Sequence, residues 1–329
     1  MRLHPLLAAA LLLLPLVHAQ ERSTVEAPAP AQAAAHLAYG QRLATTLAQE
    51  GGARELALAA LLVAAAEEDA GRSPQVEAWR RAAAAAAGTD VLANQLLVAS
   101  AADEGDAIAR EAARRWQAAE PDNLIPLLHA GLTIDALLAQ AGGASRADAG
   151  LYPGVRWIAS AWRRHPPQAA EQAAMTGGQP LDLEEAAAVT AMSLWAATAM
   201  PGYAPLVEAC DQRMLRALPA RRGDCRHVAL LLADRSTSIA DQAAGLAMLR
   251  ALASSAAERD EVDARARRMD WRMLQWGRLA RQQPRDGAGQ FARLLADASV
   301  TSEQQLVDRV LAEGGVAPEP PADWTPPRR

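Results

Sequence analysis

The chain contains no lysine, so all of its 33 basic residues are arginine, against 38 acidic residues. Phosphate-binding loops of the Walker type require a lysine, and its absence excludes that class of nucleotide site. The mild negative balance also argues against a general nucleic-acid binder, because neutralising phosphates takes a basic surface. We therefore expect no nucleic-acid partner.

Motifs for catalysis and for metal binding are missing as well. The sequence has no Gly-x-Ser-x-Gly, no His-Glu-x-x-His and no Cys-x-x-Cys, which are the patterns of a nucleophile elbow, a helical zinc site and a redox pair. Acidic clusters at 67–69 and 103–106 lack the spacing of a calcium loop and are interpreted as solvated turns. We predict no catalytic residues, no cofactor and no metal site.

Long apolar runs are absent except at the amino terminus. After Arg2, the run Pro5 to Val17 is followed by Ala19 and Gln20, with small residues at the minus-three and minus-one positions of a cleavable secretory signal. The run has about 13 residues, fewer than the roughly 20 that a spanning helix needs. We predict cleavage after Ala19, no transmembrane segment, and a periplasmic or secreted bacterial protein.

What the chain does have is helix-forming composition. Aromatic residues make up only 4% of it and strand-favouring side chains are scarce, whereas alanine is roughly a quarter of the residues. This predicts an all-α fold of roughly 13 to 15 helices joined by loops of about two to six residues. Such loops make neighbouring helices antiparallel, and a long row of hairpins favours an α-solenoid.

Local signals mark where several helices begin. Ser73-Pro74, Asp90 and Asp106 are predicted N-terminal caps, because their side-chain oxygens can accept from the free amides of a first turn. Capping boxes, in which two side chains bond the first turn reciprocally, are predicted at three further places. These are Ser238-x-x-Asp241, Ser255-x-x-Glu258 and Thr301-x-x-Gln304.

Composition divides the chain into four parts. Residues 1–19 are the predicted signal peptide, and 20–30 are polar and proline-bearing, typical of a flexible linker. Residues 31–315 form the helical repeat domain, and 316–329 form a proline-rich tail that contains Trp324. Within the domain, 139–154 is the longest stretch expected to be irregular.

One segment resembles a tetratricopeptide repeat. Ala109 and Pro121 have the separation of that family's second-helix alanine and its closing proline, and 127–131 falls where the next first helix carries a large apolar residue and glycine. A related break between helices occurs at 88–92. The sequence departs from the family at Trp116, where the family has a small residue. The resemblance covers about residues 75–143 and implies helical hairpins that bind proteins through a concave face.

Cys210 and Cys225 are the only cysteines. Cys210 lies on an apolar stripe of a predicted 206–218 helix, and Cys225 lies on the stripe of the next helix. An even pair of cysteines in an oxidising compartment is usually bridged, so we predict a disulfide. Two buried free thiols are the alternative, because an unbroken 206–218 helix would put Cys210 two turns away from the connecting turn.

Aromatic and arginine clusters are the remaining candidates for binding. Tyr152, Trp157 and Trp162 follow the irregular 139–154 stretch, where a small-molecule pocket would be expected if the chain has one; filling gaps in an alanine-rich core is the alternative. Arginine pairs recur at 80–81, 114–115, 163–164, 221–222 and 267–268. They are interpreted as solvated faces, with contact to an anionic partner such as lipopolysaccharide or an acidic protein as the alternative.

Two functional hypotheses follow. The first is an exported, non-enzymatic helical-repeat scaffold that binds a protein partner in the bacterial cell envelope. The second is an all-α envelope enzyme that acts on a polysaccharide or on peptidoglycan. The absence of a catalytic constellation favours the first.

Overall fold

The computed structural model describes residues 30–66, 73–103, 105–198, 202–282 and 287–327. These residues form seventeen α-helices and one 3-10 turn, and among them two isolated β-bridges are the only extended pairings. The all-α prediction is confirmed for this part of the chain. The predicted signal peptide (1–19) lies outside the described residues, as does the linker (20–30) apart from Pro30, where α2 begins.

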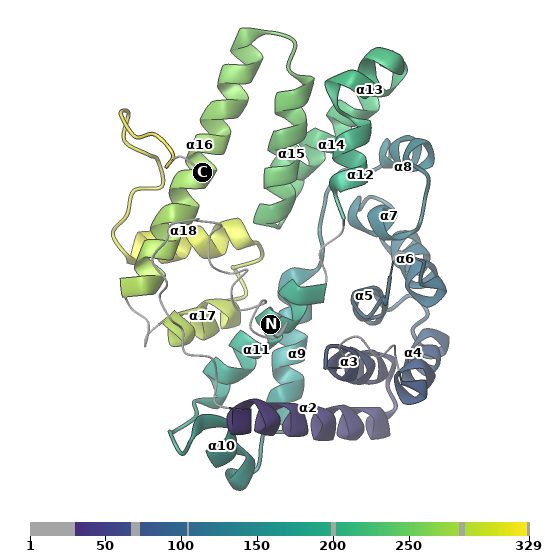
Figure 1. Cartoon of the computed structure of the whole chain (residues 1–329), viewed down its shortest axis with the longest axis vertical. Helices are drawn as coiled ribbons and strands as arrows, with labels where there is room; N and C mark the ends of the chain where they lie inside the picture. The colour runs from purple at the N-terminus through teal and green to yellow at the C-terminus, as the bar shows by residue number, and fades with distance from the viewer. Residues whose placement is uncertain (1–29, 67–72, 104, 199–201, 283–286, 328–329) are drawn as a thin grey trace.

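The helices of the first half follow one another up one side of the molecule (Figure 1). Each packs against the next in the chain, which confirms the predicted pairing of sequence neighbours. They are α2 (Pro30–Glu50), α3 (Ala53–Ala64), α4 (Pro74–Ala86), α5 (Val91–Ala99), α6 (Ala107–Ala119), α7 (Ile125–His129) and α8 (Ile134–Ala141).

Helices of the second half also contact helices far away in the sequence. Helix α10 packs on α2, α17 packs on α9 and α11, and α18 packs on α16. The elements are α9 (Leu151–Arg164), α10 (Ala169–Thr176), α11 (Leu183–Thr198), α12 (Ala204–Ala209), α13 (Gln212–Ala217), η1 (Pro219–Arg221), α14 (Arg222–Arg235), α15 (Ile239–Leu252), α16 (Ala256–Gln282), α17 (Gly287–Ala296) and α18 (Glu303–Glu313). The irregular stretch predicted at 139–154 is shorter than expected, since α8 and α9 leave only 142–150 between them.

Three predicted helix starts are confirmed in the first half, and one start in the second half is shifted. Ser73, Asp90 and Asp106 each accept a hydrogen bond from the first turn of their helix. Near 301, however, the cap is Ser302, and Gln305 bonds the Thr301 amide at 2.7 Å. The pattern is therefore one residue later than predicted, because serine and threonine in adjacent positions both suit a cap.

The second predicted capping box is confirmed in half. Glu258 N donates to the Ser255 hydroxyl at 3.1 Å, as a box requires. The Glu258 carboxylate instead accepts from the amide and hydroxyl of Ser254, one residue earlier than expected. Both bonds satisfy free groups at the start of α16.

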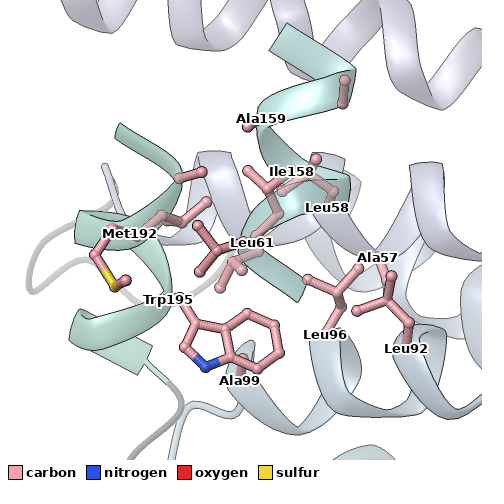
Figure 2. Close-up of a cluster of buried hydrophobic side chains, with 14 of the residues drawn as sticks. Ala57, Leu58, Leu61, Leu92, Leu96, Ala99, Ile158, Ala159, Met192 and Trp195 are labelled. Atoms are coloured by element: carbon pink, nitrogen blue, oxygen red, sulfur yellow. The ribbon is translucent and has the colours of Figure 1, made fainter. Parts of the chain in front are cut away.

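The described helices share two clusters of buried side chains. The first joins α3, α5, α9 and α11, where Leu61, Leu96, Ile158 and Trp195 pack together (Figure 2). The second contains Trp116 of α6 and much of α8, α14 and α15. Because alanine is small, these helices approach closely and the few large side chains fill the space left between them.

Gly245 shows how close that approach is. A Cβ at this position of α15 would lie 2.4 Å from the backbone nitrogen of Ala233 in α14. No side chain fits there without separating the two helices. The long packing of α14 on α15 therefore depends on a glycine at the crossing.

Arg80 is buried, so the interpretation of every arginine pair as a solvated face is wrong at this position. Its side chain is 2% exposed and lies between α4 and α6. The guanidinium donates to Ser100 Oγ at 3.1 Å, to Glu77 at 2.9 Å and to Asp106 at 2.6 Å. Asp106 was expected in a solvated turn, but its carboxylate both caps α6 and neutralises a buried charge.

Candidate functional site

The three aromatic residues predicted to mark a pocket all belong to α9, and two of them are buried. Tyr152 is 1% and Trp162 is 8% exposed, and both are part of the first cluster. The Trp162 ring contacts Tyr39 edge-on at 4.7 Å, whereas Trp157 lies under the guanidinium of Arg164. This placement fits the core-filling alternative.

Two polar atoms of these aromatic residues are left over. The Tyr152 hydroxyl and the Trp162 indole nitrogen are buried without a hydrogen-bond partner among the described residues. Trp162 borders a hollow of about 10 Å³, the room of a single water, and Tyr152 and Trp157 do not line it. A small-molecule pocket at these residues stays a prediction.

The predicted disulfide is present. Cys210 and Cys225 are bonded, with their Cα atoms 5.6 Å apart. The single 206–218 helix is wrong, because α12 ends at Ala209 and Asp211 caps a new helix by accepting from Met214 N at 2.7 Å. Leu218 is 41% exposed and does not continue the apolar stripe of Cys210. Because the helix is broken after Cys210, the two-turn distance that favoured free thiols no longer applies.

A hollow of the described chain lies where α14, α15, α16 and α18 meet. Its volume is about 150 Å³. Arg265, Arg268 and Arg272 line it from α16, with Gln242 of α15 and Gln304 of α18. The rest of the wall is apolar, formed by Ala233, Ile239, Leu246, Met269, Met273 and Val307. We refer to this hollow as the arginine cavity.

Helical spacing explains why three arginines line one cavity. Positions three and four residues apart share a face of a helix, as Arg265, Arg268 and Arg272 do on α16. Arg265 pairs with Asp234 of α14 and Arg272 with Asp308 of α18, while Arg268 lies 3.9 Å from Glu319 of the tail. That α18 packs over these arginines could not be predicted from local spacing, because it depends on how two separate helices pack.

Two buried polar atoms in the wall of the arginine cavity lack partners among the described residues. They are Nε of Arg272, a donor, and Oε1 of Gln304, an acceptor. Burial lowers the pKa of the Arg272 guanidinium; Glu319 opposes that shift and Arg268 adds to it. An unsatisfied buried group costs about 1–3 kcal/mol, and both atoms are covered by their neighbours, so they are a local cost of packing α18 on α16.

A buried group of hydrogen-bonded polar side chains connects helices that line the arginine cavity, and we refer to it as the junction. The Asp241 carboxylate accepts from the Tyr203 hydroxyl and, at 2.6 Å, from the Ser236 hydroxyl. Glu303 accepts from Ile239 N at 2.7 Å, which ties the start of α15 to the start of α18. Burial raises the pKa of both carboxyls above their ordinary values.

This junction corrects the first predicted capping box, Ser238-x-x-Asp241. Ser238 does cap α15, but Asp241 turns inward to Ser236 and Tyr203, and a carboxylate from α18 bonds the Ile239 amide of the first turn. Sequence reasoning missed the junction because Tyr203, Asp241 and Glu303 come from three separate elements. A local reading of Ser238-x-x-Asp241 predicts only the local bond.

Among the described residues, no group of three or more histidine, cysteine, aspartate or glutamate side chains could hold a metal ion. None of the described helices is both long enough and apolar enough to cross a membrane. The chain matches no family model, no curated protein and no solved structure. Its function is therefore argued from geometry alone.

Proposed function

We propose that the chain is an exported, non-enzymatic helical scaffold that binds a protein partner in the bacterial cell envelope through the arginine cavity. The observation that carries the proposal is the size and lining of that cavity. Its volume of about 150 Å³ is below the roughly 300–1,000 Å³ of sites for drug-sized ligands. It offers room for one side chain, with apolar walls for its stem and arginines for a polar or anionic end.

Protein interfaces commonly bury single anchoring side chains in pockets of this kind. Arg265, Arg268 and Arg272 line one side of the cavity and give such a side chain guanidinium donors. Arg268, whose side chain is 47% exposed, provides a charge at the surface of the same site. These features favour a partner that presents an acidic group.

The tetratricopeptide-like solenoid belongs to the same proposal, and the resemblance covers about residues 75–143 in the first half of the chain. In that half each helix packs on the next, as stacked hairpins do. Export is supported by the Cys210–Cys225 disulfide, since such bonds persist in oxidising compartments. Intact-mass measurement of the exported protein should find Gln20 as its first residue; a chain that keeps residues 1–19 would refute the cleavage.

Site-specific photo-crosslinking in cells tests the proposal. A photoreactive side chain replacing Arg268 should give a discrete cross-linked product with an envelope protein. The matched control replaces Arg213 of α13, which is 73% exposed and does not line the cavity. Equal products from both positions, or none from Arg268, would contradict binding at the cavity.

The envelope-enzyme alternative has one observation in its favour. Asp241 and Glu303 are buried carboxyls with raised pKa values, and such pairs can serve as general acid and base. Both, however, already bind groups that hold α15 and α18 in place. Hydrolysis of peptidoglycan or polysaccharide by the purified chain, lost in Asp241→Asn while the fold is kept, would favour the enzyme over the scaffold.

A further inference from the structure

The proline-rich tail returns along α16 after α18 ends. Figure 1 shows this yellow segment beside α16, and hydrogen bonds fix it there. The Trp271 indole donates to the carbonyl of Ala317 at 3.0 Å, and Arg267 donates to the carbonyl of Trp324 at 3.3 Å. The rings of Trp271 and Trp324 meet edge-on at 5.3 Å.

Charge adds to this seating. Glu319 of the tail lies 3.9 Å from Arg268, which also lines the arginine cavity. The negative charge of Glu319 acts on Arg272 as well, so the tail lies close to the row of arginines. The tail thus brings an acidic group to the site at which the proposed function expects a partner's acidic group.

The tail is held by few contacts. Trp324 is half-buried, whereas Glu319, Asp323 and most of the prolines are exposed. No tail residue belongs to either buried cluster. Proline restricts the unbound chain, so docking such a segment costs little conformational entropy, as in proline-rich ligands of aromatic-lined grooves. A segment held in this way is well placed to exchange with a similar one.

We propose that the tail is a tethered occupant of a peptide-binding face on α16, and that the partner displaces it with an extended, acidic, proline-containing segment that carries an aromatic residue. The identity of the partner segment rests on the proposed function; occupancy of the face by the tail does not. The face consists of Arg267, Arg268 and Trp271.

Tethering sets the size of the expected effect. A short linker gives an effective concentration of about 1 mM, so a free peptide that binds with a Kd of about 0.1 mM competes at a disadvantage of about tenfold. Unseating the tail in the full chain should therefore strengthen binding of the free peptide by about that factor.

The experiment uses a fluorescent synthetic peptide of residues 316–329 and the full-length chain. The double variant Glu319→Gln/Trp324→Ala should bind the peptide about tenfold more tightly than the wild-type chain does, measured by anisotropy. Thr325→Ala, a change at an exposed tail residue, is the matched control and should bind as the wild type does. Equal affinity of the wild-type chain and the double variant would overturn the proposal.

Two further measurements keep the test specific. Adding Trp271→Ala to the double variant should abolish binding of the peptide. If that triple variant does not fold, the same point is tested with a peptide that carries Trp324→Ala, which should not bind the double variant. Concentration-dependent dimers of the wild-type chain would overturn the proposal, since the face would then hold the tail of a second copy. Peptide binding without a cross-link at Arg268 would contradict only the scaffold function, whereas a cross-link without the affinity difference would contradict only the tail's role.

Discussion

Replacing Arg80 with methionine should lower the free energy of unfolding by about 3 kcal/mol or more. Methionine keeps the apolar stem and removes the guanidinium, which is 2% exposed. The Asp106 side chain, only 7% exposed, would lose the guanidinium and remain buried. Breaking a buried pair in this way typically costs 3–5 kcal/mol.

The lower end of that range applies here for a structural reason. Asp106 also accepts from the backbone amides of Ala102 at 3.2 Å and Ala109 at 3.0 Å, and these bonds would continue to stabilise its charge. At roughly 2–4 °C per kcal/mol, the melting temperature should fall by about 6–12 °C.

A double-variant cycle isolates the pair. In Arg80→Met/Asp106→Asn, asparagine can still cap α6 and no buried charge is left. The double variant should therefore lose about 1–3 kcal/mol less than the sum of the single variants. Urea unfolding followed by circular dichroism gives each value.

Arg81→Met is the matched control, because Arg81 is the neighbouring residue and is exposed. Its unfolding free energy should stay within about 0.5 kcal/mol of the wild type. If Arg80→Met matched this control, or if the two changes were simply additive, the reasoning about the buried pair would be refuted.

Three further predictions concern the second cluster and the junction. Cys225→Ser should cost about 3 kcal/mol for a loop of this length and speed hydrogen exchange chiefly in α12 to α14; unchanged exchange there would count against it. Gly245→Ala should cost about 1–3 kcal/mol in thermal unfolding, because its Cβ meets the α14 backbone, whereas Gly223→Ala, with open space around it, should be neutral or stabilising. Burial raises the pKa of the Asp241 carboxyl in the folded chain above its ordinary value of 3.8. Ionising this carboxyl therefore lowers the free energy of unfolding as the pH rises above 3.8, and Asp241→Asn should flatten that decline. Parallel plots of unfolding free energy against pH for the variant and the wild type would contradict the prediction.

Much of the local structure could be predicted because its causes are local. A cap forms between residues three apart, so Ser73, Asp90 and Asp106 could be recognised from the sequence. Ser255 likewise marks the start of α16, where its hydroxyl accepts from Glu258 N. The disulfide could be predicted because only two cysteines exist, although the helix break that brings them together could not.

The candidate site could not be predicted in the same way. Its polar wall joins Arg272 of α16 to Gln304 of α18, and Glu319 arrives from a tail that composition alone describes as irregular. Of the residues proposed for a pocket, Tyr152, Trp157 and Trp162, the first and last are buried among other side chains, and the pocket itself stays a prediction. Aromatic side chains serve both roles, and only their neighbours in space decide between them.

By itself, therefore, the sequence determined the helical class, the starts capped by Ser73, Asp90 and Asp106, and the pairing of the cysteines. The class depends on composition, each cap on residues within a turn of one another, and the pairing on there being only two cysteines. The tertiary structure alone decided that Arg80 is buried, that Asp241 turns inward and that the arginines of α16 line a cavity beside the tail. These outcomes depend on which helices pack against each other. That packing joins segments far apart in the chain, so local residue spacing does not encode it.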